Sequence, residues 1–200
     1  MNSEITLKTY NVFKRQLPEE IFKFIKKECN EHQKLEELKS GLSGTGVPKH
    51  YFLEKSKDLL QPFIFKLAKE YDLKNNYLRD NIKVLTNDAP WFLDKPWVNI
   101  QKPNQFIPIH NHDGIFSYVI WISIPYDVEK ECVPPSKHAS CFQFFYPSIT
   151  GSFQAHTIRV SKADEGTILL FPSLLLHCVY PFYTVKEPRL SVSGNVLLKV

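Results

Sequence analysis

The second half of the chain consists of short apolar segments separated by turn-forming residues. From residue 81 onward, runs rich in β-branched and aromatic residues are bounded by Pro, Gly, Asp or Ser, a pattern typical of strands. The runs read IFSYVIWISIP, CFQFFYP, SFQAHTIRV, GTILLFPS and RLSVSGNVLL. Because no helical pattern separates them, residues 81–200 are predicted to form an antiparallel sandwich or barrel of the jelly-roll kind.

The first 80 residues instead carry apolar positions at helical spacing. Segment 16–32 has Pro18 near its start, two acids in its first turn and lysines towards its end, and these are helix signals. A second apolar stripe runs from Leu59 to Tyr71, and the glycine-rich segment 41–46 between the two is predicted to be a loop. We therefore expect a mainly β protein with helices, a single domain over 1–200. The helices of 1–80 would pack on one outer face of the β core formed by 81–200.

Composition narrows the class of protein. The net charge of +4, from 25 basic and 21 acidic residues, is small and spread along the chain, so no nucleic-acid partner is expected. No run of 18 apolar residues exists, so we expect no membrane span. An apolar signal segment is also lacking at the start of the sequence, and we expect a cytoplasmic protein. The four cysteines form no C-x-x-C pair and are predicted to be reduced thiols.

Candidate metal ligands occur in the segment FIPIHNHDG, which contains His110 and His112. Residues two apart on a strand face the same side, so the two imidazoles would project together. Such a pair can bind Fe, Zn, Cu or Ni, or it can simply be two polar residues at the edge of a strand. Asp113 would point the other way unless a bulge redirects it.

His177 is a third candidate ligand. It follows the apolar run GTILLFPS and has leucines before it and Cys178 and Val179 after it. This setting also fits a core histidine whose nitrogens are satisfied by hydrogen bonds. In a jelly roll, however, strands far apart in sequence lie side by side, so His177 can face His110 and His112.

The segment RLSVSGNV has polar and apolar residues in alternation. As a strand it would present Arg189, Ser191, Ser193 and Asn195 on one face. A guanidinium inside an apolar barrel needs a partner, because a buried unpaired charge is unfavourable. A ligand carboxylate held by Arg189 and a serine hydroxyl would supply one. The alternative is that Arg189 points to solvent or pairs with an acid of the protein.

Four motifs occur in an order that resembles a known family. They are H-x-H-x-G, an aromatic strand, G-T-I-L-L-F-P-S-x-x-x-H-x-V-x-P and R-x-S-x-S-x-N, and the segment WVNIQKPNQFIPIH leads into the first. Together they resemble the iron(II)/2-oxoglutarate-dependent oxygenases, most closely the small prolyl-hydroxylase-like branch. The resemblance covers residues 95–198 and is loose in the helical first half.

The resemblance implies a double-stranded β-helix that holds Fe(II) through His110, His112 and His177. Arg189, helped by Ser191, would bind the far carboxylate of 2-oxoglutarate. The implied reaction is that of a dioxygenase: it hydroxylates a substrate C–H bond while 2-oxoglutarate and O2 become succinate and CO2. The substrate would be a peptidyl prolyl, another protein side chain or a small molecule.

Position 112 departs from the pattern of most of the superfamily, which has Asp or Glu there. Three neutral imidazoles would leave the iron centre one unit more positive than two histidines and a carboxylate. Two alternatives remain. Asp113 ligates the iron through a local bulge, or His110 and His177 hold it while His112 stands beside the site.

Two other functions also fit part of the sequence. A cupin-type dioxygenase with three histidines needs no 2-oxoglutarate, but that pattern calls for a Glu shortly after His112 and does not explain Arg189. A non-catalytic jelly-roll binding module would use the histidines only for packing. The histidines and tryptophans outside the motifs are expected to be structural: His32, His50, His138, His156, Trp91, Trp97 and Trp121.

Overall fold

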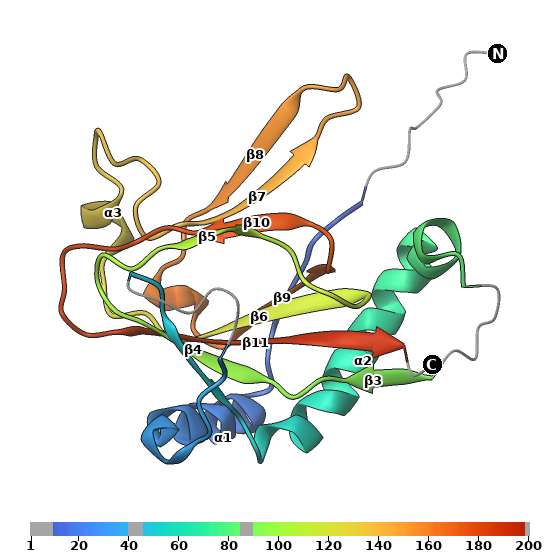
Figure 1. Cartoon of the computed structure of the whole chain (residues 1–200), viewed down its shortest axis with the longest axis horizontal. Helices are drawn as coiled ribbons and strands as arrows, with labels where there is room; N and C mark the ends of the chain where they lie inside the picture. The colour runs from blue at the N-terminus through green and yellow to red at the C-terminus, as the bar shows by residue number, and fades with distance from the viewer. Residues whose placement is uncertain (1–9, 40–45, 85–89, 199–200) are drawn as a thin grey trace.

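The chain folds into two antiparallel sheets that face each other, with two long helices on the outer side of the larger sheet (Figure 1). The computed structural model describes residues 10–39, 46–84 and 90–198. The predicted loop at 41–46 therefore lies almost entirely outside the described residues, and the start of the sequence lies outside them too. The two-layer arrangement is the one that the jelly-roll prediction requires.

The larger sheet has the strand order β1–β9–β6–β11–β4–β2, and β3 also pairs with β11. Its central strand β6 is apolar on both faces because both are covered. Tyr118 and Ile120 pack into the core beneath the helices, whereas Val119 and Trp121 face the smaller sheet. The strands are β1 Phe13–Gln16, β2 Lys49–Phe52, β3 Trp91–Leu93, β4 Trp97–Gln101, β6 Phe116–Ser123, β9 Thr167–Pro172 and β11 Arg189–Leu198.

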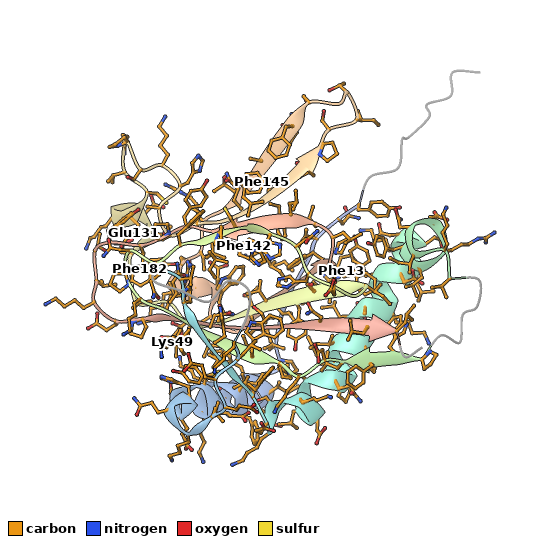
Figure 2. All side chains as sticks on the ribbon, viewed as in Figure 1. Phe13, Lys49, Glu131, Phe142, Phe145 and Phe182 are labelled. Carbon is orange, nitrogen blue, oxygen red and sulfur yellow. The ribbon has the colours of Figure 1, made fainter. Side chains whose placement is uncertain are left out.

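The smaller sheet has the strand order β5–β10–β7–β8. Phe142 projects from β7 into the interior (Figure 2) and packs against Trp121 and Phe171 of the larger sheet. The hairpin of β7 and β8 extends beyond the body of the molecule (Figure 1). The strands are β5 Ile107–His110, β7 Phe142–Pro147, β8 Phe153–Ile158 and β10 Leu176–Val179.

Helices α1 Glu19–Asn30 and α2 Ser56–Asn75 cover the larger sheet. Helix α1 begins directly after Pro18, as predicted. The buried carboxylate of Glu28 ties the helices together, because it accepts hydrogen bonds of 2.8–2.9 Å from the backbone N–H groups of residues 54–56. No helix in the described part of the chain combines the length and apolar character needed to cross a membrane. The short helical segments are η1 His32–Lys34, η2 Leu78–Ile82, α3 Val128–Glu131 and η3 Lys162–Asp164.

Two short strands in the first 80 residues were not predicted. Strand β1 pairs with β9, and β2 pairs with β4. Each is only four residues long, too short for an alternating pattern to stand out. Their hydrogen-bond partners lie far along the chain, so the pairing is a tertiary effect. The helical prediction is thus correct for α1 and α2 and misses two strands that extend the sheet.

The four cysteines are buried free thiols, as expected. The sulfur atoms of Cys132 and Cys141 lie 3.4 Å apart, and the Cys132 thiol also lies 3.0 Å from the backbone carbonyl of Ala139. This pair closes the loop between α3 and β7. The loop matters for the site because the carbonyl of Ser140 belongs to it.

Gly194 lies on β11 directly opposite Tyr118 of β6. A Cβ atom at this position would overlap the Tyr118 ring, 2.6 Å from its Cζ. Tyr118 is 1% exposed and cannot move aside. We expect Gly194→Ala to lower the free energy of unfolding by about 1–3 kcal/mol, measured by urea denaturation.

The Tyr118 hydroxyl has no hydrogen-bond partner among the described residues. Tyr118→Phe is therefore expected to leave the protein at least as stable as the wild type, because it removes an unpaired buried oxygen. It should also recover part of the stability lost in Gly194→Ala. A Gly194→Ala variant as stable as the wild type would contradict this account of β11.

Candidate active site

Strand pairing brings the three predicted histidines together. His177 of β10 lies directly opposite His110 of β5, and their ring centroids are 4.3 Å apart. The ring of His112, two residues beyond, lies 4.9 Å from that of His110 and 5.1 Å from that of His177. One ligand nitrogen from each histidine lies within 4.8 Å of the others, a spacing that fits a metal ion.

Backbone carbonyls orient two of the rings. Nδ1 of His110 is 2.8 Å from the carbonyl oxygen of Pro108, and Nδ1 of His177 is 2.9 Å from that of Leu175. A carbonyl only accepts, so each Nδ1 donates a proton and each Nε2 keeps its lone pair. This is the arrangement by which proteins prepare a histidine to bind a metal through Nε2.

The chain turns sharply after His112. The backbone N–H of His112 donates to the carbonyl of Ser173, at 3.0 Å, and its ring lies 5.9 Å from that of Trp97. Gly114 has a φ of +98°, which favours glycine. A Cβ there would also lie 2.8 Å from the carbonyl oxygen of Val196. The glycine of H-x-H-x-G therefore lets the chain enter β6 while His112 stays beside the other histidines.

Burial keeps the imidazoles neutral. It lowers the pKa of His110, that of His112 to about 4 and that of His177 to about 3. Repulsion from His110 adds to the lowering for the other two. Removal from water disfavours the charged imidazolium. At neutral pH all three side chains are thus in the form that binds a metal.

Asp113, the alternative ligand, is not part of the histidine cluster. Its side chain is exposed, and the metal-binding cluster found among the described residues contains His112 rather than Asp113. The carboxylate would have to turn inward to reach the other two histidines.

A pocket of about 290 Å³ lies between the two sheets, and the histidines line it. Its walls are largely aromatic, with a polar strip along β4 and β11. The aromatic lining includes Trp97, Trp121, Phe142 and Phe171; the polar lining includes His50, Asn99, Arg189, Ser191 and Ser193. The pocket thus joins the predicted metal ligands to the predicted carboxylate-binding residues.

Arg189 is 2% exposed, and its hydrogen-bond partners among the described residues are all neutral. Its guanidinium donates to the hydroxyl of Tyr126 at 2.8 Å, to the carbonyl of Ser140 at 2.7 Å, to the side-chain oxygen of Gln101 and to the carbonyl of Tyr180 at 3.4 Å. No ion pair to Arg189 exists within the described part of the chain. A buried charge held only by neutral acceptors favours an anion nearby. The pocket therefore has a buried positive charge in its wall.

Polar and apolar residues of β11 face opposite sides of the sheet, as predicted. Arg189, Ser191 and Ser193 line the pocket, whereas Leu190 and Val192 belong to the core on the other face. The alternative in which Arg189 points to solvent or pairs with an acid is wrong for the described residues, because the side chain is buried and its partners are neutral.

The sequence profile of a family described as "Putative 2OG-Fe(II) oxygenase" matches residues 95–195, the segment that carries the histidines and Arg189. The chain belongs to this family. This 2OG-Fe(II) oxygenase is therefore an enzyme whose reaction uses Fe(II), 2-oxoglutarate and O2. The resemblance noted from the motifs is confirmed.

Solved structures confirm the fold of the oxygenase as a double-stranded β-helix. A Pseudomonas putida prolyl-4-hydroxylase aligns with a TM-score of 0.61 and 14% identity, covering 96% of this chain and 94% of that one. A Trichoplax adhaerens prolyl hydroxylase, solved with a hypoxia-inducible-factor peptide fragment, gives 0.60 and 11% identity over 95% and 84%. The epimerase SnoN of nogalamycin biosynthesis gives 0.62 and 15% over 93% and 76%. No curated protein sequence matches the chain.

Several residues that line the pocket of the oxygenase or contact Arg189 were missed by sequence reasoning. Trp97, Asn99 and Gln101 occupy alternate positions of β4, and this period of two on an otherwise apolar strand was the available signal. His50 was expected to be structural, and it is buried and lines the pocket from the short strand β2. Tyr126 follows β6 in a turn, where no local pattern indicates its contact with Arg189.

The stability of the metal-free oxygenase should depend on pH through its buried histidines. His177 has a pKa of about 3 in the folded protein, against about 6.5 in an unfolded chain. Between these values the unfolded state binds more protons, so stability present above pH ~6.5 is lost as the pH falls towards 3. Between pH ~7 and ~5, His177 alone should lower the free energy of unfolding by about 2 kcal/mol.

Urea denaturation of metal-free protein at the two pH values checks this expectation. His177→Gln should reduce the pH dependence, whereas His156→Gln, at an exposed position on β8, should leave it unchanged. Equal pH dependence in the wild type and His177→Gln would show that this histidine is not held neutral by burial.

Proposed function

We propose that this oxygenase is a dioxygenase in which His110, His112 and His177 hold Fe(II), while Arg189 and Ser191 bind the far carboxylate of 2-oxoglutarate. One observation carries the proposal: three neutral imidazoles and a buried guanidinium without an acidic partner line the same pocket. A metal cation satisfies the imidazole lone pairs, and a dicarboxylate that reaches from the metal to Arg189 satisfies the guanidinium.

The donor set fits ferrous iron. Imidazole is a suitable ligand for iron, and three ligands leave positions open for 2-oxoglutarate and O2. His112 is the proposed third ligand because its ring faces those of His110 and His177, whereas Asp113 is exposed. A centre of three neutral ligands is one unit more positive than one with a carboxylate.

The anion site fits the far end of 2-oxoglutarate. A guanidinium attracts a carboxylate through its charge and its N–H donors; the four terminal N–H groups of Arg189 already donate to neutral acceptors, and Nε–H remains. The seryl hydroxyl at position 191 lies on the same pocket-facing side of β11. Arg189 is itself held by four neutral groups. The guanidinium is therefore fixed in place before an anion arrives, and little conformational entropy is lost when it binds.

The bound iron and 2-oxoglutarate supply the oxidation, in which O2 and 2-oxoglutarate yield succinate, CO2 and a hydroxylated substrate carbon. The protein holds, orients and shields these groups. The aromatic side chains of Trp121, Phe142 and Phe171 line the pocket and limit the entry of water. Hydrogen bonds from the histidine Nδ1 atoms to backbone carbonyls keep the Nε2 atoms directed at one point.

The proposed substrate is a protein or peptide side chain, with prolyl as the first candidate. The pocket of about 290 Å³ is just below the range of about 300–1,000 Å³ that is typical of ligand sites. This small volume favours a substrate that inserts a single side chain and keeps the rest of its chain outside. Two proteins with the same fold are prolyl hydroxylases, one of them solved with a peptide.

Release of succinate and CO2 from 2-oxoglutarate by the iron-loaded protein tests this proposal. We expect turnover that depends on iron and rises with a proline-containing peptide but not with the same peptide carrying alanine. His177→Ala should abolish both iron binding and turnover, because it removes one of three ligands. Lack of iron-dependent turnover together with lack of 2-oxoglutarate binding in calorimetry would refute the proposal. Oxygen consumption without 2-oxoglutarate would support a cupin-type reaction instead.

The identity of the third ligand is tested by substitutions at two neighbouring positions. His112→Ala is expected to weaken Fe(II) binding about 100-fold, equivalent to ~2.7 kcal/mol, measured by anaerobic calorimetry. His112→Asp should restore binding, because it recreates two histidines and a carboxylate. Asp113→Ala is the matched control and should bind iron like the wild type. The reverse result, in which only Asp113→Ala loses iron, would assign the ligand to Asp113.

A further inference from the structure

Asn99 lies at the centre of a hydrogen-bond network in the polar wall of the pocket. Across β2 and β4 it pairs with His50, and across β4 and β11 it pairs with Ser191. The three residues therefore form one row across three adjacent strands. Asn99 is 6% exposed, and all three line the pocket.

Two donors determine how the Asn99 amide is oriented. The indole Nε1 of Trp97 lies 3.1 Å from its Oδ1, and Nδ1 of His50 lies 2.7 Å from the same atom. An indole N–H can only donate, so the atom that it faces must be the amide oxygen. His50 must then also donate from Nδ1. The amide cannot flip without losing both hydrogen bonds.

The amide nitrogen consequently points to β11. Nδ2 lies 3.0 Å from Oγ of Ser193 and 3.2 Å from both Oγ and the backbone carbonyl oxygen of Ser191. Because Nδ2 can only donate, its two N–H groups are shared among these three acceptors, and both hydroxyl oxygens receive hydrogen bonds from it. Neither hydroxyl donates to an acceptor in the described part of the chain, so the proton of each is free for a ligand in the pocket.

These hydroxyls continue a line of donors that starts at Arg189. The three side chains occupy alternate positions of β11 and line the same pocket. Ser193 pairs with Trp97, whose ring lies beside that of His112. The line thus runs from the guanidinium towards the histidines. A row of donors without a competing acid fits the carboxylate of a ligand that extends along it.

We propose that Asn99 is a positioning residue for 2-oxoglutarate. It acts through Ser191 and Ser193: Asn99 donates hydrogen bonds to their hydroxyl oxygens, so that the hydroxyl protons are directed at the ligand. Trp97 and His50 hold it in the orientation that makes this possible. The inference rests on the proposed function, because it takes the far carboxylate of 2-oxoglutarate to lie at Arg189.

Calorimetry on oxygen-free, Mn(II)-loaded protein tests the role of Asn99 without turnover. The ligands are 2-oxoglutarate and oxalate, which chelates a metal but lacks the far carboxylate. Asn99→Asp keeps the size of the side chain and an acceptor for Trp97 and His50, but it would draw the seryl protons away from the ligand. Asn99→Leu removes all hydrogen bonds without adding charge.

Both variants are expected to bind Mn(II) like the wild type and 2-oxoglutarate at least tenfold more weakly. The loss for 2-oxoglutarate should exceed the loss for oxalate at least tenfold in Asn99→Asp. Equal losses for the two ligands, or loss of Mn(II) binding, would indicate a merely structural role and overturn the inference.

Trp97→Phe removes one of the two donors that hold the amide, so a smaller loss of 2-oxoglutarate affinity, two- to fivefold, is expected. Trp91→Phe is its matched control. That tryptophan packs against Phe65 and Phe116 outside the pocket lining, and its replacement should leave affinity unchanged. If Trp97→Phe lowers the affinity for 2-oxoglutarate no more than Trp91→Phe does, the role given to the indole is contradicted.

Arg189→Lys separates this inference from the proposed function, because it changes the carboxylate site without touching Asn99. If Arg189→Lys weakens 2-oxoglutarate binding at least tenfold and both Asn99 variants stay within twofold of the wild type, the role of Asn99 is refuted and the proposed site stands. If Arg189→Lys also binds like the wild type, the carboxylate is not at Arg189 and both fail.

Discussion

The antiparallel pairing of β5 with β10 is the contact on which the candidate active site depends. It sets His177 opposite His110 although 67 positions separate them in the sequence. The sheet that contains this pair is only four strands wide and needs the aromatic residues between the two sheets to hold it in place. The metal site is thus built on a strand pair whose position is set by packing against β6 and β9. Of the three proposed ligands, only His112 lies outside a strand.

The two walls of the pocket have opposite hydrogen-bonding character. On the smaller sheet, backbone carbonyls accept hydrogen bonds from Nδ1 of His110 and His177, so the Nε2 lone pairs of these rings are directed inward. On the larger sheet, Asn99 occupies hydroxyl oxygens and leaves protons directed inward, next to the buried charge of Arg189. Lone pairs suit a cation and protons suit an anion. The pocket is therefore matched to a metal ion with a carboxylate-bearing partner, and hydrogen bonds deeper in each wall create this polarity.

Three neutral histidines give the proposed iron site an unusual charge balance. With Fe(II) the ligand set carries a charge of about +2; together with Arg189 and a bound dicarboxylate the formal sum is about +1, whereas a carboxylate in place of one histidine would make it zero. Burial keeps the imidazoles neutral without metal, as the lowered pKa values of His112 and His177 indicate. The buried Arg189 then adds one positive charge at the other end of the pocket. Both charges favour an anionic ligand that spans the space between them.

The sequence by itself determined the features that are periodic or local. The alternation of β11 predicted which side of the strand carries Arg189 and Ser191, and the spacing of His110 and His112 predicted that they share a face. The ordered motifs indicated the family. Only the tertiary structure decided that β1 and β2 extend the larger sheet and that Asn99 and His50 line the pocket. It also decided which neutral groups accept hydrogen bonds from Arg189. These features depend on hydrogen bonds between strands that are distant in sequence, and no local pattern encodes the orientation of an amide or the choice of a ring nitrogen.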